Sequence, residues 1–98
     1  MRLYKLAADQ NDTSAQYSLG MCYESGTGVS RDYTEAAKYY KLSADQGIPD
    51  AQYNLGLCYE KGKGVDKNLK EALKYYKLAA CQYHVKAMAK VTLLYFRA

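Results

Sequence analysis

Two nearly identical phrases in the sequence combine residue types that can do chemistry. Residues 19–29 read LGMCYESGTGV and residues 55–65 read LGLCYEKGKGV, each with a cysteine and a Gly-x-Gly. A glycine-rich loop binds phosphate where it follows a strand and leads into a helix whose N-terminus faces the anion. Here the glycines follow a helical pattern, and no Gly-Lys-Ser/Thr is present. The phrases therefore predict tight turns and no nucleotide site.

Cysteine and histidine usage does not indicate a metal or redox site. The chain holds three cysteines, Cys22, Cys58 and Cys81, and one histidine, His84. Cys22 and Cys58 occupy equivalent positions in two copies, whose helix axes should lie about 8–10 Å apart, farther than a disulfide allows. Zinc needs four clustered ligands, and no Cys-x-x-Cys occurs. We predict buried free cysteines, with no metal and no cofactor.

Acid–base or nucleophilic catalysis has little support in the sequence. His84 follows a predicted helix, with no serine, cysteine or carboxylate in an evident constellation around it. Carboxylates recur as Glu24 with Glu35 and as Glu60 with Glu71, but helix capping explains the second member of each pair. We predict that the chain is not an enzyme.

The phrases recur because the sequence repeats with a period of 36 residues. Residues 15–50 and residues 51–86 agree at 20 of 36 positions. Residues 1–14 match the end of a preceding unit, and residues 87–98 begin a further, degenerate first helix. Because such units bury their apolar faces by stacking on one another, residues 1–98 are expected to form one repeat domain.

Each unit is predicted to be a pair of antiparallel helices. Apolar residues follow a helical period in both halves of the unit. The stripes are Ala15, Leu19, Cys22 and Tyr23 in the first helix, and Ala36, Tyr40, Ser43 and Ala44 in the second. Small residues, among them Gly20, Ala36 and Ala37, allow the helices to approach closely. The pattern favours an α-solenoid of helix-turn-helix units.

Turn and cap residues indicate where these helices begin and end. Gly26 is expected to end the first helix in the left-handed conformation, and Gly47 to end the second. Asp32 with Glu35 forms a capping-box pattern at the start of the second helix. The equivalent residues of the second copy are Asn68 and Glu71. Pro49 suits the first turn of the next helix.

The motif AQYxLGxCYExGxGV, followed by EAxKYYKLxADQG, resembles the Sel1-like repeat, a relative of the tetratricopeptide repeat. The Leu-Gly-x-x-Tyr that both repeats share is present at residues 19–23 and 55–59, while the period of 36 and the Gly-x-Gly-Val favour Sel1. The resemblance implies an all-α superhelix of antiparallel helix-turn-helix repeats. It also implies adaptor and scaffold roles, as in endoplasmic-reticulum-associated degradation and in bacterial interactions with host cells.

The resemblance also brings an enzymatic alternative. One cysteine-rich bacterial branch is described as penicillin-binding or β-lactamase-like, and two cysteines in each of its repeats bridge neighbouring helices. The matching positions here hold Ala8 and Gln16, then Ala44 and Gln52. A hydrolase of this branch is therefore the disfavoured alternative.

The first helices line a concave groove in related solenoids, and the sequence has a second stripe there. Tyr17, Met21 and Glu24 stand apart from the core stripe, and the second copy repeats them. The candidate partner-binding residues are Tyr17, Met21, Glu24, Tyr53, Asn54, Leu57 and Glu60. In the alternative, Tyr17 and Met21 pack against the next repeat. Alanine at Tyr17 and Tyr53 is expected to weaken partner binding without unfolding the chain.

Charge and hydropathy narrow the class of partner. The net charge is +4, with lysines interspersed among acidic residues, and no apolar run approaches the roughly 20 residues of a membrane span. The second copy gathers Lys61, Lys63, Lys67, Lys70, Lys74 and Lys77. A solvated face is the usual role of such a run, so nucleic acid is not favoured. A module that binds RNA or an anionic surface through this lysine patch remains an alternative.

These observations predict a non-enzymatic adaptor that binds another protein or peptide. The odd number of cysteines and the absence of a secretory signal in the first residues favour the cytoplasm. The last segment, VKAMAKVTLLYFRA, is apolar on more than one side. Because solenoid ends need polar caps to stay soluble, self-association through the terminal helices is a second partner prediction.

Overall fold

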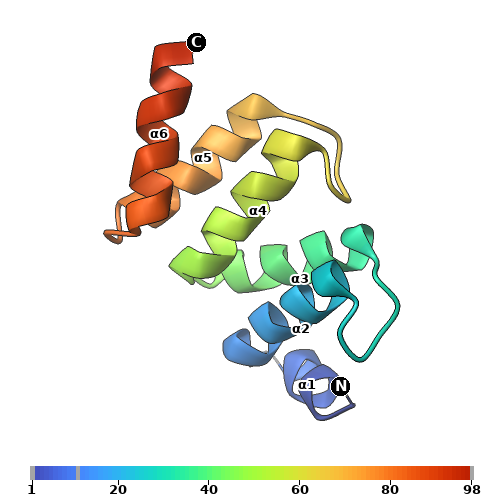
Figure 1. The fold of residues 1–98 in the computed structure, drawn as a ribbon. Coiled ribbons are helices and arrows are strands. Elements are labelled where there is room, and N and C mark those ends of the chain that lie inside the picture. The colour runs from blue at the N-terminus through green and yellow to red at the C-terminus, as the bar shows by residue number, and fades with distance from the viewer. Residues whose placement is uncertain (1, 11, 98) are drawn as a thin grey trace.

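The computed structural model describes residues 2–10 and 12–97, and these residues form six helices (Figure 1). The helices are α1 (Arg2–Asp9), α2 (Thr13–Ser25), α3 (Tyr33–Asp45), α4 (Pro49–Lys61), α5 (Leu69–Ala80) and α6 (Val85–Arg97). Residues 1, 11 and 98 belong to the predicted end units and lie outside the described residues.

The helices stack in the order of the sequence. Each helix packs on its neighbours in the sequence, most extensively α2 with α3 and α4 with α5, and the chain measures 43 × 24 × 16 Å along its principal axes. The N-terminal helix α1 and the C-terminal helix α6 lie at opposite ends of the stack, and the loops after α2 and α4 project on the same side (Figure 1). The predicted all-α solenoid is confirmed.

Glycine and capping residues end and begin the helices as predicted. Gly26 and Gly62 follow α2 and α4 with φ of 77° and 71°. The N–H of each donates to the carbonyl of the cysteine four residues earlier, which satisfies an otherwise unpaired helix C-terminal acceptor. Gly47 has φ of 90°, and Pro49 opens α4.

Only one of the two hydrogen bonds of the predicted capping box is present in each copy. The Asp32 carboxylate accepts the backbone N–H of Glu35 at 3.2 Å, as expected for the cap. The Asp32 backbone N–H, however, donates to the carbonyl of Tyr23 at 2.9 Å, and Asn68 makes the same two kinds of bond in the second copy. The reciprocal glutamate bond is therefore replaced by one that closes the loop onto the preceding helix.

The core is a row of helix–helix contacts in which small residues face tyrosine rings. Tyr40 and Tyr76 are completely buried. A Cβ added at Gly20 would lie 2.6 Å from the Tyr40 ring, and one added at Gly56 would lie 2.6 Å from the Tyr76 ring. The prediction that small residues allow close helix approach is confirmed for Gly20, and Gly56 makes the same contact in the second copy.

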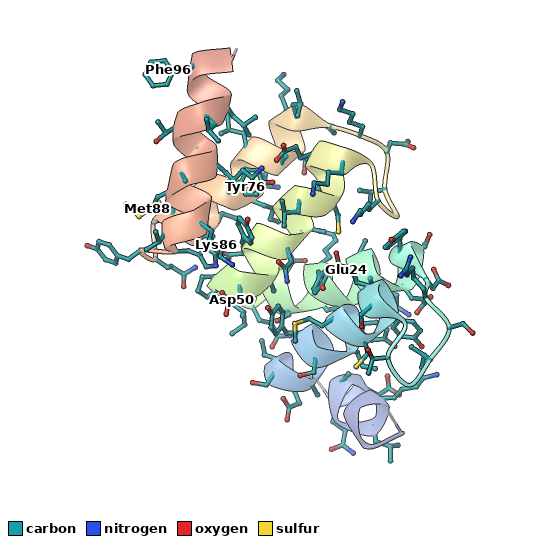
Figure 2. The ribbon with its side chains drawn as sticks, viewed as in Figure 1. Glu24, Asp50, Tyr76, Lys86, Met88 and Phe96 are labelled. Atoms are coloured by element: carbon teal, nitrogen blue, oxygen red, sulfur yellow. The ribbon has the colours of Figure 1, made fainter. Side chains whose placement is uncertain are left out.

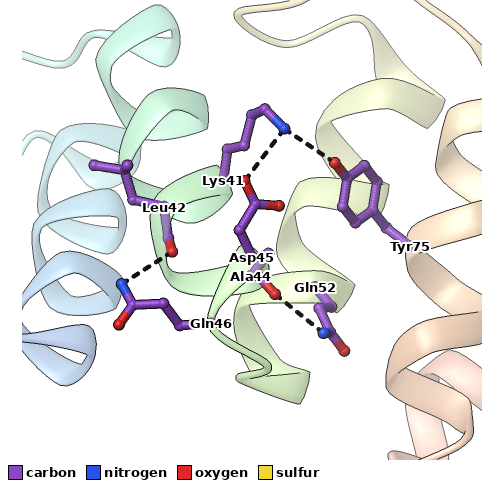
Figure 3. A network of polar contacts seen from close by, with 7 residues as sticks. All are labelled: Lys41, Leu42, Ala44, Asp45, Gln46, Gln52 and Tyr75. Carbon is purple, nitrogen blue, oxygen red and sulfur yellow. Dashed lines mark hydrogen bonds and ion pairs between the residues drawn. The ribbon is translucent and has the colours of Figure 1, made fainter. Parts of the chain in front are cut away.

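Polar side chains connect each repeat to the next (Figure 3). The Lys41 ammonium on α3 donates to the Tyr75 hydroxyl on α5 at 3.3 Å and also pairs with Asp45 on its own helix at 3.4 Å. The buried Gln52 amide donates to the carbonyl of Ala44 at 3.1 Å, across the α3–α4 turn.

The glutamines occupy the positions at which the resemblance to the cysteine-rich branch would place bridging cysteines. Gln16 donates to the Ala8 carbonyl at 3.2 Å, and Gln52 to the Ala44 carbonyl at 3.1 Å. The Gln46 side-chain amide in turn donates to the side-chain oxygen Oε1 of Gln16 at 2.7 Å. Hydrogen bonds of the Gln16 and Gln52 side chains thus connect the helices here. The nitrogen and the oxygen of each of these buried amides both have a partner.

Candidate functional site

A groove of about 530 Å³ opens where the C-terminal half of α2 faces α4. Its lining residues are Ser18, Met21, Cys22, Glu24, Ser25, Thr27, Tyr40 and Asn54. Most come from α2 and its following turn, with one residue each from α3 and α4. The groove therefore depends on the stacking of one repeat on the next.

Glu24 is the charged residue of this groove (Figure 2). One of its carboxylate oxygens accepts the Tyr40 hydroxyl at 2.5 Å. Burial, the hydrogen bond to Glu24 and the charge of Glu24 all raise the pKa of Tyr40, so this hydroxyl stays a donor at neutral pH. Among the residues whose side chains the structure describes, no lysine or arginine forms a salt bridge with Glu24.

Glu60 is the equivalent carboxylate of the second repeat, and it has a cation. Tyr76 donates to Glu60 at 2.6 Å, and the Lys90 ammonium of α6 lies 3.2 Å from it. Burial alone would raise the pKa of Glu60, but the hydrogen bonds from Tyr76 and Lys90 and the nearby positive charges outweigh it and lower the pKa. The carboxylate thus remains ionised and paired.

Each of the two candidate tyrosines packs on a tyrosine of the following helix. The Tyr17 ring lies 5.9 Å from the Tyr40 ring, and the Tyr17 hydroxyl accepts the Asn54 amide at 3.3 Å. Tyr53 lies 5.7 Å from the Tyr76 ring in the same way. Of the two residues in the alternative, Tyr17 contacts the next repeat through Asn54, whereas Met21 is exposed. Alanine at Tyr17 or Tyr53 should therefore lower the stability of the fold as well as remove surface available to a partner. The expectation from sequence was a loss of partner binding alone.

The remaining candidate residues differ between the two copies. Met21 is 43% exposed at the mouth of the groove. Leu57, its equivalent, is half-buried against the core cluster that contains Tyr76. The structure therefore brings Met21, Glu24 and Asn54 together at an open groove. In the second copy, Leu57 packs on the cluster that contains Leu94 of α6, and Glu60 pairs with Lys90 of α6. The repeated sequence pattern does not indicate that this surface is open in the first copy and covered in the second.

His84 has a carboxylate partner that sequence reasoning missed. Its Nε2 lies 2.8 Å from Asp50 Oδ1, and its Nδ1 accepts the backbone N–H of Ala87 at 3.1 Å. The ring also stacks on Tyr53, with centroids 4.8 Å apart. The expectation of no carboxylate near His84 is wrong, because repeat stacking brings Asp50 to it from 34 residues away. The imidazole therefore caps the N-terminus of α6 and, through Asp50, connects it to α4.

The three cysteines are free and lie in different environments. Cys58 is buried, Cys22 is half-buried and Cys81 is exposed. Burial, with a smaller contribution from the charge of Glu24, raises the pKa of the Cys58 thiol to about 11, so it is protonated at neutral pH. The prediction of burial is wrong for Cys81, because that residue follows the last turn of α5.

In the part of the chain that the structure describes, no three histidine, cysteine or acidic residues group as metal ligands. Nor does any helix among these residues have the length and apolar character to cross a membrane.

The stacked helix pairs, the turn glycines and the inter-repeat groove define a helical-repeat protein of the solenoid class. The Sel1 repeat family model matches residues 1–12, 13–48 and 49–84. The chain belongs to the Sel1 repeat family. A search of curated proteins gave no match.

Solved structures of bacterial repeat proteins share this fold. A Sel1 repeat protein from Oxalobacter formigenes is 45% identical over 87% of this chain and 35% of its own, with a TM-score of 0.84. The protein c5321, a protective antigen of uropathogenic Escherichia coli with an SLR fold, is 44% identical over 84% of this chain and 18% of its own, with a TM-score of 0.82. Helicobacter pylori cysteine rich protein B is 31% identical over 90% of this chain and 66% of its own, with a TM-score of 0.84.

The chain thus spans only about a third of the first of these proteins and about a fifth of the second. Sel1 repeat proteins are generally protein-interaction modules and are typically non-enzymatic scaffolds. The comparisons give no support to the hydrolase alternative.

Proposed function

We propose that this chain is a protein-interaction module that holds a segment of a partner protein in the groove between α2 and α4. The supporting observation is the open groove of about 530 Å³ with the exposed Met21 at its mouth. A methionine side chain is flexible and polarisable, so it adapts to varied apolar partners. Ser18, Thr27 and Asn54 supply hydrogen-bonding groups around it.

The partner is bound through side chains, because the groove is bounded by helices. Helices satisfy their own backbone groups internally, so they offer no sheet edge to which a strand could add. An extended segment or a helix can lay an apolar residue on Met21 and direct polar groups to the serine and threonine hydroxyls. Fold-level analogy to other helical solenoids agrees with this mode but does not carry the proposal.

Met21→Ala is expected to weaken binding of groove-directed peptides about fivefold, the equivalent of about 1 kcal/mol of lost apolar contact. The probes are peptides selected from a phage-displayed random library on the purified chain, with affinity measured by fluorescence polarisation. Because Met21 is partly exposed, thermal unfolding should change little.

Leu78→Ala is the matched control for this measurement. Leu78 is 43% exposed, as is Met21, but it lies on α5, away from the groove. Peptide affinity should be unchanged in this variant. Equal losses in both variants, or selected peptides that ignore Met21, would contradict the proposed groove.

Self-association through α6 is a second candidate interaction. Val85, Met88 and Phe96 are exposed on one face of this helix, with Phe96 89% exposed and directed away from the other helices (Figure 2). Leu93, which is 57% exposed, extends the apolar surface. Apolar residues gathered in this way mark an interaction surface more often than single ones do.

The solution mass of the chain should therefore rise with concentration in light scattering after size exclusion. Phe96→Glu is expected to return the mass to that of a monomer, because a carboxylate cannot be buried there without a partner. Tyr83→Glu, at a residue 84% exposed in the turn before α6, is the control and should leave the mass unchanged. A constant monomer mass at all concentrations would refute this candidate.

A further inference from the structure

We propose that the groove beside Glu24 recognises a lysine or arginine side chain of the partner segment. This inference rests on the proposed function and adds the chemical identity of the anchoring residue. It is drawn from a comparison of the two repeats, because the second repeat holds the same carboxylate with a cation in place.

The Glu60 site shows what the carboxylate of this repeat can bind. Lys90 extends from α6 and brings its ammonium to 3.2 Å from one Glu60 oxygen and 3.4 Å from the other. The Tyr76 hydroxyl donates to the same carboxylate from the core side at 2.6 Å. A tyrosine donor on one side and an ammonium on the other thus satisfy this half-buried group.

The first repeat has the carboxylate and the tyrosine but not the cation. Residue 54, which is 36 positions before Lys90, is an asparagine. The Asn54 amide is directed to the Tyr17 hydroxyl at 3.3 Å and forms no hydrogen bond with Glu24. In the described part of the chain no other cation takes its place, and the groove lies there instead.

The fixed position of Glu24 favours an incoming cation. The Tyr40 bond orients the carboxylate, so a ligand does not bear the entropy of ordering it. Glu24 is the one charged residue lining the groove, and Met21 beside it can cover the methylene stem of a lysine or arginine.

The experiment uses the whole chain and small probes of defined chemistry. Nα-acetyl-lysine methylamide, Nα-acetyl-arginine methylamide and Nα-acetyl-norleucine methylamide are titrated at millimolar concentrations and followed by amide NMR shifts. The two cationic probes should shift resonances of Met21, Glu24 and Asn54, and norleucine should bind about fivefold more weakly. Glu24→Gln should remove this preference.

Two substitutions exchange the sites between the repeats. Asn54→Lys should place an ammonium at Glu24 from within the chain and abolish the shifts there. Lys90→Asn should open Glu60 and create a second set of shifts around Leu57 and Glu60. Thermal melts of each variant establish that the fold is retained.

The outcomes separate this inference from the proposed function. Equal binding of norleucine and lysine probes, cation binding that persists in Glu24→Gln, or no shifts in the groove would each overturn the basic anchor. Selected peptides that depend on Met21 but not on Glu24 would overturn it while the groove still binds. If cationic probes bind at Glu24 but no peptide depends on Met21, the proposed function fails and the cation site remains.

Discussion

Gly64→Ala is expected to lower the free energy of unfolding by about 3 kcal/mol or more. Gly64 has φ of +75°, which costs an L-residue about 1–2 kcal/mol. A Cβ at this position would also lie 2.0 Å from the carbonyl oxygen of Tyr33 and 2.4 Å from its carbonyl carbon. Those atoms are backbone at the start of α3, so they cannot rotate away. The loop after α4 would have to separate from the preceding repeat.

Gly47→Ala is the control that measures the backbone strain without a collision. Gly47 has φ of +90°, but no atom lies within 4 Å of an added Cβ. Its alanine variant should lose only the strain, about 1–2 kcal/mol. Urea denaturation followed by far-ultraviolet circular dichroism gives both values. Equal losses at Gly64 and Gly47 would show that the loop does not press on α3.

The helices of this fold could be predicted from sequence because their signals are local. Gly26 follows a stripe of helical period and takes the left-handed conformation, and Asp32 stands where a cap is needed. The repeat then supplies each signal twice, so Gly62 and Asn68 confirm the same boundaries one unit later. Period and cap chemistry are sufficient for the solenoid class.

The chemistry between repeats could not be predicted in the same way. Asp50 meets His84, and Lys90 meets Glu60, across 34 and 30 residues of sequence. Such pairs depend on how far one repeat rotates on the next, which no single helix pattern encodes. Once one inter-repeat contact is known, the period predicts its copies. The Gln46–Gln16 bond, for instance, recurs between Gln82 and Gln52.

Because contacts between repeats could not be predicted, the sequence indicated only some features of the candidate groove. Tyr17, Met21 and Glu24 share one helix face, as the stripe indicated, but that face is divided between packing and solvent. Tyr17 accepts a hydrogen bond from Asn54 of the next repeat and packs on the core cluster that contains Leu55, whereas Met21 is exposed. Which side chains the neighbour covers depends on residues such as Asn54, one repeat away.

Gly56→Ala is expected to destabilise the chain by about 1–3 kcal/mol, the cost of overpacking a core. In an exposed helix interior the same change stabilises by roughly 0.5–1 kcal/mol, because glycine has more backbone freedom to lose. Here an added Cβ would lie 2.6 Å from the ring of Tyr76, which is completely buried. The ring cannot swing aside easily, because its hydroxyl is bonded to Glu60 at 2.6 Å. The collision should therefore outweigh the helix propensity.

Thr92→Ala is the matched control, since residue 92 occupies the same repeat position as Gly56, 36 residues later. Thr92 is exposed on α6, and its hydroxyl bonds only to its own helix, at the Met88 carbonyl. Alanine there should leave the free energy of unfolding within about 0.7 kcal/mol of the parent, slightly on the stable side. A Gly56→Ala chain as stable as the parent in urea would mean that the Tyr76 ring has room to move. The Gly–Tyr contact would then be a consequence of the stacking distance between helices and not its determinant.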